Sequence, residues 1–374
     1  MHIRRHRLTQ SIAMQTSATS PSSGYDIVDL SIFPLREPVS GRTYSVVRLR
    51  TRGGLTGYGE CAKVSYDDLE KARQAIVGRP ATSYSVTRTS TPLDGAITTA
   101  MIDISARLAK TPAYRLLGGP TRTKVRALAT LTGSTDTELK SSLASAQQAG
   151  YRAFQVPLPA VTARNQGQAF DRSVRARMEG LRSAAASGSD FVLDGAGRLT
   201  PGDASSVAAT LERFHLLWFD EPCSVVNLRA VSKISDESVT PIGFGRDIGD
   251  PSVFQELLRE GVVDILRPDL QQNGIPRIRQ IATLAETYYT AIAPNHLGGP
   301  IGTAASIHLA ASLPNFFIQH VPIAAAEPDR QMRAELAGKE IETVQDGFLA
   351  LPGGPGLGIE VNEAALERYK DKTA

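Results

Sequence analysis

Six apolar runs decide the fold of this chain: FVLD (residues 191–194), LLWFD (216–220), PIGFGR (241–246), DILRPD (264–269), TAIAPNH (290–296) and FFIQH (316–320). Each run ends on a polar residue, and in order these residues are Asp194, Asp220, Arg246, Asp269, His296 and His320. Short apolar runs bounded in this way are typical of buried parallel strands. The regular endings therefore predict strands that present their last side chains to one common site.

Two earlier runs, residues 125–131 and 152–158, raise the number of predicted strands after Pro120 to eight. Amphipathic stretches between the runs predict helices, for example at residues 136–150 and 252–261. Eight strands with intervening helices favour a closed parallel barrel over an open sheet. The carboxyl ends of the strands form the active face of such a barrel, so the six polar residues should converge there. For any single one of them, a surface loop position is the alternative.

The regions on either side predict a second, smaller domain. Residues 25–63 contain three strand-like runs with a tight turn at 52–54, a pattern that predicts an antiparallel meander. A mainly helical stretch follows, and the turn-rich tail of the chain is expected to pack back on the meander. We therefore expect an α+β capping domain of residues 23–118, completed by residues 340–374, and a barrel domain of residues 119–339.

Composition narrows the functional classes. The chain has 374 residues, with 41 Lys and Arg against 38 Asp and Glu, and no basic run that would predict nucleic-acid binding. No apolar stretch has the length of a membrane span. Cys61 and Cys223 are too few for a disulfide framework, which favours a reducing, cytoplasmic setting. Residues 1–22 lack the apolar segment of an export signal and are expected to be a disordered tail.

Spacing and local sequence together resemble a known family. The six polar residues are 26, 26, 23, 27 and 24 positions apart. Asp220-Glu221-Pro222 is similar to a Glu-Glu-Pro motif, and residues 352–358 (PGGPGLG) to the closing loop, of the enolase superfamily's mandelate racemase/muconate lactonizing enzyme group. This resemblance covers residues 23–374. It implies a modified (β/α)7β TIM-like barrel under a capping domain, a homo-oligomer, and abstraction of the proton α to the carboxylate of a small-molecule acid.

The resemblance also implies a Mg²⁺ ion that stabilises the enediolate intermediate. Asp194 and Asp220 match the first two metal ligands, but Arg246 replaces the third, and a guanidinium has only donors and stays charged. Asp247 or Glu221 would substitute only if the strand ends were irregular. We expect Arg246 to form a salt-bridged cluster in the metal's place, which makes the Mg²⁺ doubtful. Arg246 would then either bind the substrate carboxylate or only neutralise the two aspartates.

Other positions follow from the same resemblance. Asp269 and His296 match a catalytic Asp/His dyad, in which the carboxylate would fix the tautomer of the imidazole base. His320 stands where the group often has a Glu, and it would contact or protonate a substrate carboxylate or pair with Asp194 or Asp220. Gln155 occupies the place of a second-strand lysine and is a candidate substrate contact. Cys61 lies in the expected cap loop, where it would be a contact at most.

The missing second-strand lysine favours a one-base elimination over a two-base racemisation. The sequence therefore predicts a carbon–oxygen lyase, a dehydratase of a hydroxy acid or sugar acid. Two alternatives stay open: a non-catalytic acid-binding member of the family, and a metal-independent isomerase or cycloisomerase.

Overall fold

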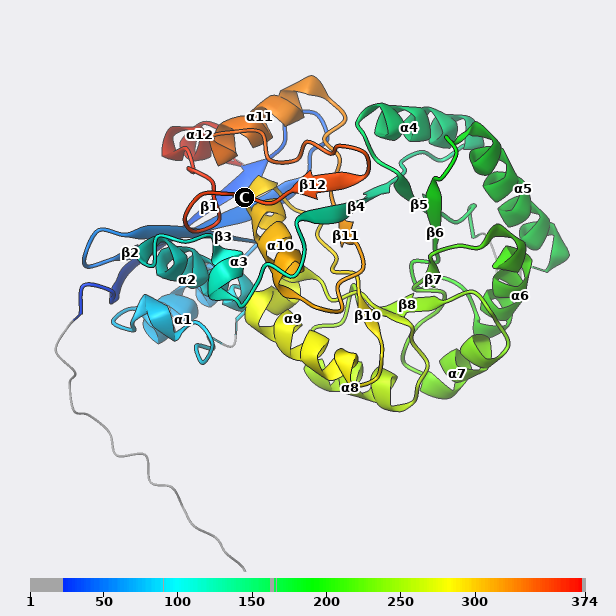
Figure 1. Ribbon diagram of the computed structural model, residues 1–374, viewed down its shortest axis with the longest axis horizontal. Helices are drawn as coiled ribbons and strands as arrows, with labels where there is room; N and C mark the ends of the chain where they lie inside the picture. Colours follow the sequence, from blue (N-terminus) through cyan, green and yellow to red (C-terminus); the bar gives the residue numbers. More distant parts are fainter. Residues whose placement is uncertain (1–22, 90, 162–164, 166, 372–374) are drawn as a thin grey trace, which may run out of the picture.

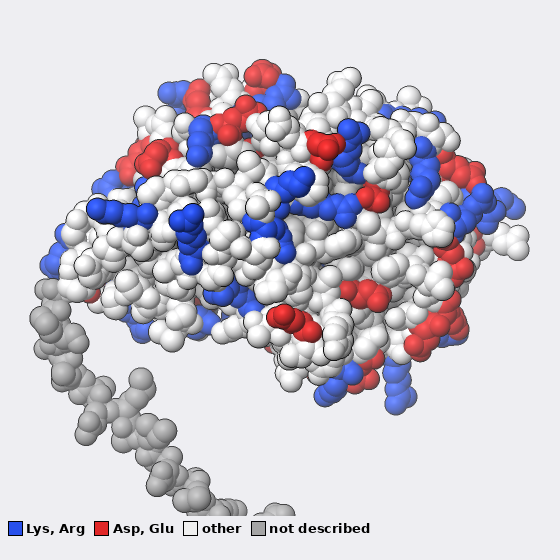
Figure 2. All heavy atoms as spheres, viewed as in Figure 1, with Lys and Arg blue, Asp and Glu red and all other residues white. Residues whose placement is uncertain are grey.

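The computed structural model describes residues 23–371 except residues 90, 162–164 and 166. The predicted tail at residues 1–22 lies outside the described residues. Figure 1 shows a ring of helices around a curled sheet, with a smaller lobe at one side. Among the described residues, no helix combines the length and the apolar character needed to cross a membrane. Basic and acidic side chains are interspersed over the face in Figure 2.

All eight predicted barrel strands are present. They are β4 (Lys124–Thr130), β5 (Ala153–Pro157), β6 (Asp190–Asp194), β7 (Trp218–Asp220), β8 (Ile242–Phe244), β9 (Ile265–Leu266), β10 (Ala291–Ile292) and β11 (Gln319–His320). From β4 to β10 each strand pairs in parallel with the next in the chain, and β11 pairs in parallel with β4. A parallel bridge between Ile292 and Phe316 links the last two strand segments. The expected TIM-like barrel is confirmed.

Helices cover the outside of the barrel. They are α4 (Asp136–Gln148), α5 (Gln168–Ala184), α6 (Pro201–Leu211), α7 (Leu228–Asp236), α8 (Pro251–Arg259), α9 (Leu270–Glu286) and α10 (Pro300–Ser312), followed by α11 (Glu327–Ala337). Several begin on a side-chain cap, as in α4, where Thr135 and Glu138 form a capping box. Because the caps fix where each helix starts, they also fix the loops that carry the strand-end residues.

The smaller lobe is the predicted meander packed on a helix. Strands β1 (Ile27–Arg36), β2 (Thr43–Thr51) and β3 (Thr56–Cys61) form an antiparallel sheet in that order. Helix α2 (Asp94–Leu108) lies against it, with α1 (Tyr66–Ile76) and α3 (Ala113–Leu116) nearby (Figure 1). The buried carboxylate of Asp103 on α2 accepts the backbone N–H groups of Tyr58 on β3 and of Leu357 in the tail. One charged side chain therefore joins helix, sheet and tail.

The tail contacts both lobes. Strand β12 (Phe348–Ala350) pairs antiparallel with β4 of the barrel, whereas we expected the strand-like tail to pack on the first domain. The later residues do reach the cap, since α12 (Glu363–Arg368) contacts β1 and the backbone N–H of Asp371 donates to Pro34. The first residues of β4, 124–126, lie outside its pairings with β5 and β11, so their backbone groups are available to β12.

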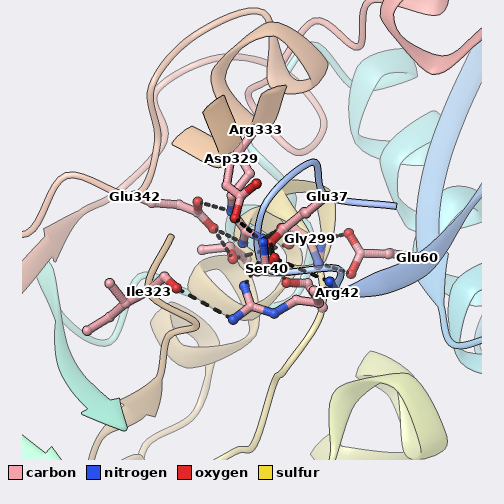
Figure 3. A network of polar contacts seen from close by, with 12 residues as sticks. Glu37, Ser40, Arg42, Glu60, Gly299, Ile323, Asp329, Arg333 and Glu342 are labelled. Carbon is pink, nitrogen blue, oxygen red and sulfur yellow. Dashed lines mark hydrogen bonds and ion pairs between the residues drawn. The ribbon is translucent and has the colours of Figure 1, made fainter. Parts of the chain in front are cut away.

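Two buried carboxylates of the cap bind the barrel. Glu60 on β3 accepts the backbone N–H of Gly299 at 2.6 Å and of Gly302 at 3.0 Å, at the start of α10. Glu37, in the loop after β1, binds Arg333 of α11 at 2.5 Å (Figure 3). These contacts set the position of the cap over the barrel.

Close packing of β3 on α2 gives a testable prediction for stability. A Cβ added to Gly59 would lie 2.0 Å from the carbonyl oxygen of Ala96, a contact with helix backbone that no rotamer change relieves. Gly59→Ala is therefore expected to lower the free energy of unfolding by about 3 kcal/mol. Gly202→Ala is the control, because among the described residues no atom outside its chain neighbours and its own helix backbone lies within 4 Å of the added Cβ. Urea unfolding measures both, and equal stabilities would contradict the packing argument.

Candidate active site at the barrel mouth

Five side chains from consecutive strand ends, β5 to β9, form a closed ring of polar contacts at the barrel mouth. Gln155 donates to Asp194 at 2.8 Å, and Arg246 binds the same carboxylate through two nitrogens at 2.6 and 3.0 Å. The Nε of Arg246 lies 3.3 Å from Oδ2 of Asp220, which Arg267 contacts at 2.9 Å. Nη1 of Arg267 also donates to Oε1 of Gln155 at 3.3 Å, which closes the ring. The salt-bridged cluster expected at Arg246 is thus present.

The ring pairs two carboxylates with two guanidinium groups. Asp220 and Arg267 are completely buried, and Trp218 adds a hydrogen bond to Asp220 at 2.8 Å. Burial alone would lower the pKa of Arg246, but Asp220 and Asp194 together raise it above its ordinary value. Arg246 therefore stays charged, and the ring carries no net charge.

These residues do not fit a Mg²⁺ site. Magnesium requires oxygen ligands in near-octahedral geometry, whereas the oxygens of Asp194 and Asp220 face guanidinium nitrogens. In the described part of the chain, no three His, Cys, Asp or Glu side chains are arranged to hold a metal ion.

The two substitute ligands that the sequence suggested do not complete a site. The carboxylate of Glu221 accepts the backbone N–H groups of Gly245 and Arg246 at 2.7 and 2.9 Å, so it holds the loop that carries Arg246. Asp247 is exposed and lines the cavity above the ring. Both contacts use Oε1 of Glu221, and among the described residues neither Glu221 nor Asp247 joins the two aspartates in a group that could hold a metal ion.

The expected pair of Asp269 and His296 is not formed. Asp269 accepts the side-chain amide of Asn295 at 2.8 Å and the backbone N–H groups of Gln271 and Gln272 at 2.9 and 3.1 Å. Nε2 of His296 contacts the carbonyl of Gly299 at 3.0 Å instead, and its Nδ1 has no hydrogen-bond partner. Successive side chains of an extended segment point to opposite sides, so the residue before His296 faces the barrel interior. The side chain that lies beside Asp269 is therefore the amide of Asn295.

His296 is enclosed by the cap and α10. Its ring lies close to Gly298 and Gly302, next to Glu60. Burial lowers the pKa of His296 to about 4, although the Gly299 carbonyl acts in the opposite direction. The same environment raises the pKa of Glu60 to about 7, mainly through burial. His296 is therefore a neutral, buried group under the cap.

Three other predicted positions are placed as follows. Nε2 of His320 lies 2.6 Å from the Thr130 hydroxyl, so His320 does not pair with either aspartate of the ring through that nitrogen. Gln155 is 1% exposed, and its side-chain nitrogen and oxygen both bind residues of the ring. Cys61 is buried in the cap core, where burial raises the pKa of its thiol to about 12. Neither residue lines the cavity described below, and their expected substrate contacts stay predictions.

A cavity of about 410 Å³ lies above the ring, between the cap loop after β3 and the ends of β8 to β10. Lys63 enters it from the cap, two residues after Cys61, and Arg246, Asp269 and Asn295 line it from the barrel. A single cavity thus holds cationic groups beside a carboxylate.

No role in the site was predicted for Lys63, Asn295 or Arg267. Arg267 stands two residues before Asp269, a spacing that places two residues on the same side of an extended strand and was therefore a usable signal. Lys63 and Asn295 depend on the exact ends of β3 and β10, which apolar runs do not define.

The ring predicts how the site responds to a third carboxylate. Arg246→Glu would remove the cation that pairs with Asp194 and one of the two that pair with Asp220, and would add a third carboxylate, so it should lower the free energy of unfolding by about 3–5 kcal/mol. Millimolar magnesium should restore part of this loss in the variant but leave the wild type unchanged, as followed by thermal unfolding. Arg246→Met is the control, since it removes the cation without adding a ligand. An equal, saturable stabilisation of the wild type by magnesium would contradict the conclusion that the ring does not fit a Mg²⁺ ion.

Comparison with known proteins gives relatives over most of the chain. A D-xylonate dehydratase of Haloferax volcanii is 25% identical over 355 residues, which cover 87% of this chain and 84% of that protein. A D-galactonate dehydratase of Ralstonia pickettii is 28% identical over 276 residues, or 73% of this chain and 72% of that protein.

Solved structures share the fold. A mandelate racemase/muconate lactonizing enzyme-like protein from Rubrobacter xylanophilus superimposes with a TM-score of 0.83 at 22% identity, covering 94% of this chain and 99% of that one. Residues 138–365 match the family described as Enolase C-terminal domain-like, and this match covers more than half of the chain. The chain therefore belongs to the enolase superfamily, in its mandelate racemase/muconate lactonizing enzyme group.

Proposed function

We propose that the chain is a dehydratase-type lyase that acts on a hydroxy acid or sugar acid in the cavity above the ring, with Asp269 as the proton acceptor. The observation that carries the proposal is the placement of the Asp269 carboxylate in one cavity with Lys63 and Arg246. The dehydratase names of the two relatives support the type of reaction.

Lys63 and Arg246 would bind the acid's carboxylate. Lys63 is exposed on the cap loop, and Arg246 lines the cavity with 16% of its side chain exposed. A guanidinium suits a carboxylate because its nitrogens form paired hydrogen bonds. These two cations would then hold the substrate between cap and barrel.

Asp269 would perform the proton transfers. Its carboxylate takes the proton from Cα, a Cα–Cβ double bond forms as the Cβ–O bond breaks, and the same proton passes to the departing hydroxyl to give water. Asn295 and the backbone N–H groups of Gln271 and Gln272 hold the carboxylate in one orientation. The enol product then becomes a keto acid.

A variant pair tests this role. Asp269→Asn is expected to slow exchange of the substrate α-hydrogen in heavy water by at least about a hundredfold, because it removes the base. His296→Asn should exchange at nearly the wild-type rate, since His296 lies under the cap and not beside Asp269. Proton NMR with D-galactonate and D-xylonate measures the exchange, and circular dichroism checks folding. Undiminished exchange in Asp269→Asn would exclude Asp269 as the base.

The pH dependence gives a second test. Burial raises the pKa of Asp269, against the lowering effect of Asn295 and the two backbone donors. Since the base must be ionised, kcat/KM should fall as the pH decreases through this raised pKa, above the value of about 4 for an exposed aspartate. The profile of His296→Asn should have the same acidic limb. A limb that disappears in that variant would assign the titration to His296.

A second candidate is a non-catalytic acid-binding protein. It is favoured by the amide of Asn295 beside Asp269, where the resemblance implied a histidine base. Thermal stabilisation by a sugar acid without α-hydrogen exchange in the wild type would favour this candidate over the lyase.

A further inference from the structure

A short turn at the start of α9 carries the backbone donors of Asp269. Gly274 has a φ of 66°, so residues 270–273 form a turn of their own before the chain continues as a regular helix. The backbone N–H groups of Gln271 and Gln272 in this turn both donate to Oδ1 of Asp269, at 2.9 and 3.1 Å. The orientation of the Asp269 carboxylate therefore depends on the position of the turn.

Glu60 of the cap binds the same turn. The side-chain amide of Gln271 donates to Oε1 of Glu60 at 3.3 Å, and the backbone N–H of Gly299 donates to the same oxygen at 2.6 Å. The backbone N–H of Gly302 donates to Oε2 at 3.0 Å. One carboxylate on β3 is therefore bound to the starts of both α9 and α10.

Gly298 leaves the space in which the carboxylate and the amide meet. A Cβ added at this position would lie 2.0 Å from Oε1 of Glu60 and 2.4 Å from Nε2 of Gln271. Any larger residue at position 298 would therefore push the two side chains apart.

Helix α2 of the cap also packs on the turn. A Cβ added to Gly95 would lie 3.0 Å from the backbone nitrogen of Gly274 and 3.1 Å from the carbonyl oxygen of Gln271. The two backbones are thus in close contact, without a side chain between them. The cap therefore restrains the turn in two ways, by backbone packing and by a hydrogen bond to a carboxylate.

Glu60 does not face the cavity above the ring. It is 5% exposed and is not among the described residues that line this cavity, whereas Gln271 and Lys63 are. Any effect of Glu60 on a reaction in the cavity must therefore be transmitted by other residues.

We propose that Glu60 is a positioning residue for the lyase reaction and acts through Gln271, whose contact holds the turn and the Asp269 carboxylate in one orientation. The inference rests on the proposed function, because it takes Asp269 as the proton acceptor. A misplacement of reacting groups by about 1 Å lowers a rate by about a hundredfold. The seating of the cap is then a condition for proton transfer as well as for substrate binding.

Amide hydrogen–deuterium exchange of the full chain, followed by mass spectrometry, tests the restraint without a substrate. Glu60→Gln keeps the size of the side chain but removes its charge, and it should speed amide exchange of residues 269–273 by about tenfold. Asp103→Asn is the matched control. Asp103 is also a buried carboxylate of the cap that accepts two backbone N–H groups, but its donors, Tyr58 and Leu357, lie outside the turn. Amide exchange of residues 269–273 should therefore stay at the wild-type rate in the control.

Steady-state kinetics with D-galactonate and D-xylonate test the effect on the reaction. The assay pH is set well above 7, because burial raises the pKa of Glu60 to about 7 and the carboxylate must be ionised. In Glu60→Gln, kcat should fall by about tenfold while KM changes by less than about twofold, since the base moves and the binding cations do not. A change in KM alone would show that Glu60 acts by placing Lys63 and would overturn the proposal.

A double-mutant cycle tests the route through Gln271. In a Gln271→Ala background, Glu60→Gln should change kcat by less than about twofold, because the contact that transmits its effect is already absent. Additive losses of kcat would overturn this route.

Gly95→Ala gives a test that leaves Glu60 intact and decides the matter if Glu60→Gln fails to fold. The added methyl group should shift the turn by a few tenths of an ångström, speed its amide exchange and lower kcat with little change in KM.

Two results of the amide-exchange experiment would overturn the proposal. One is unchanged exchange of residues 269–273 in both Glu60→Gln and Gly95→Ala, and the other is an equal increase in Asp103→Asn. If the exchange differs as expected but the wild type shows no turnover and no α-hydrogen exchange, the lyase reaction is rejected, and with it the role of Glu60 in that reaction. The restraint of the turn by Glu60 would still stand, so the two failures are distinguishable.

Discussion

The ring of Gln155, Asp194, Asp220, Arg246 and Arg267 is the constraint on which the barrel mouth depends. Two aspartates at the ends of neighbouring strands would repel each other without a cation between them. Arg246 supplies that cation from β8, and Arg267 supplies a second one from β9. Removing one partner of a buried ion pair lowers the free energy of unfolding by much more than forming the pair contributes. The ring therefore holds five strand ends in fixed positions relative to one another. The same contacts use the carboxylate oxygens that a metal would need.

Buried carboxylates that each have a partner also hold the cap on the barrel. Glu60 accepts backbone N–H groups at the start of α10, and Glu37 accepts from Arg333. Both carboxylates therefore have a partner in the barrel region. Lys63 follows Glu60 by only three residues, and the anchoring of Glu60 therefore fixes where the cap loop crosses the mouth. The contacts that hold Glu60 at the interface therefore also position Lys63 in the cavity.

The sequence predicts the fold well and the site only partly, for physical reasons. Apolar runs report burial, which is why all eight barrel strands and the meander of the cap were found. The position of Arg246 between two aspartates also predicted the ion pairs, because a guanidinium beside carboxylates has one favourable arrangement. The orientation of Asn295 and His296 was not predictable in this way, since a shift of one residue reverses the side to which each points. Cys61 was misplaced because the last residue of β3 turns into the cap core, while Lys63 reaches the cavity.

The arginine at position 246 determines how the mouth attracts an acid. Two carboxylates and two guanidinium groups sum to zero charge, so the ring itself exerts little long-range attraction on an anion. Guanidinium groups keep their charge at every working pH and cannot be removed by a chelator, so the two positive charges of the ring are permanent. Attraction of a carboxylate must then come from cations outside the ring, and Lys63 is the exposed one in the cavity above the ring. Lys63 therefore brings a cation of the cap to a cavity that Asp247 and Asp269 also line, and the contacts of Glu60 and Glu37 that seat the cap position this cation.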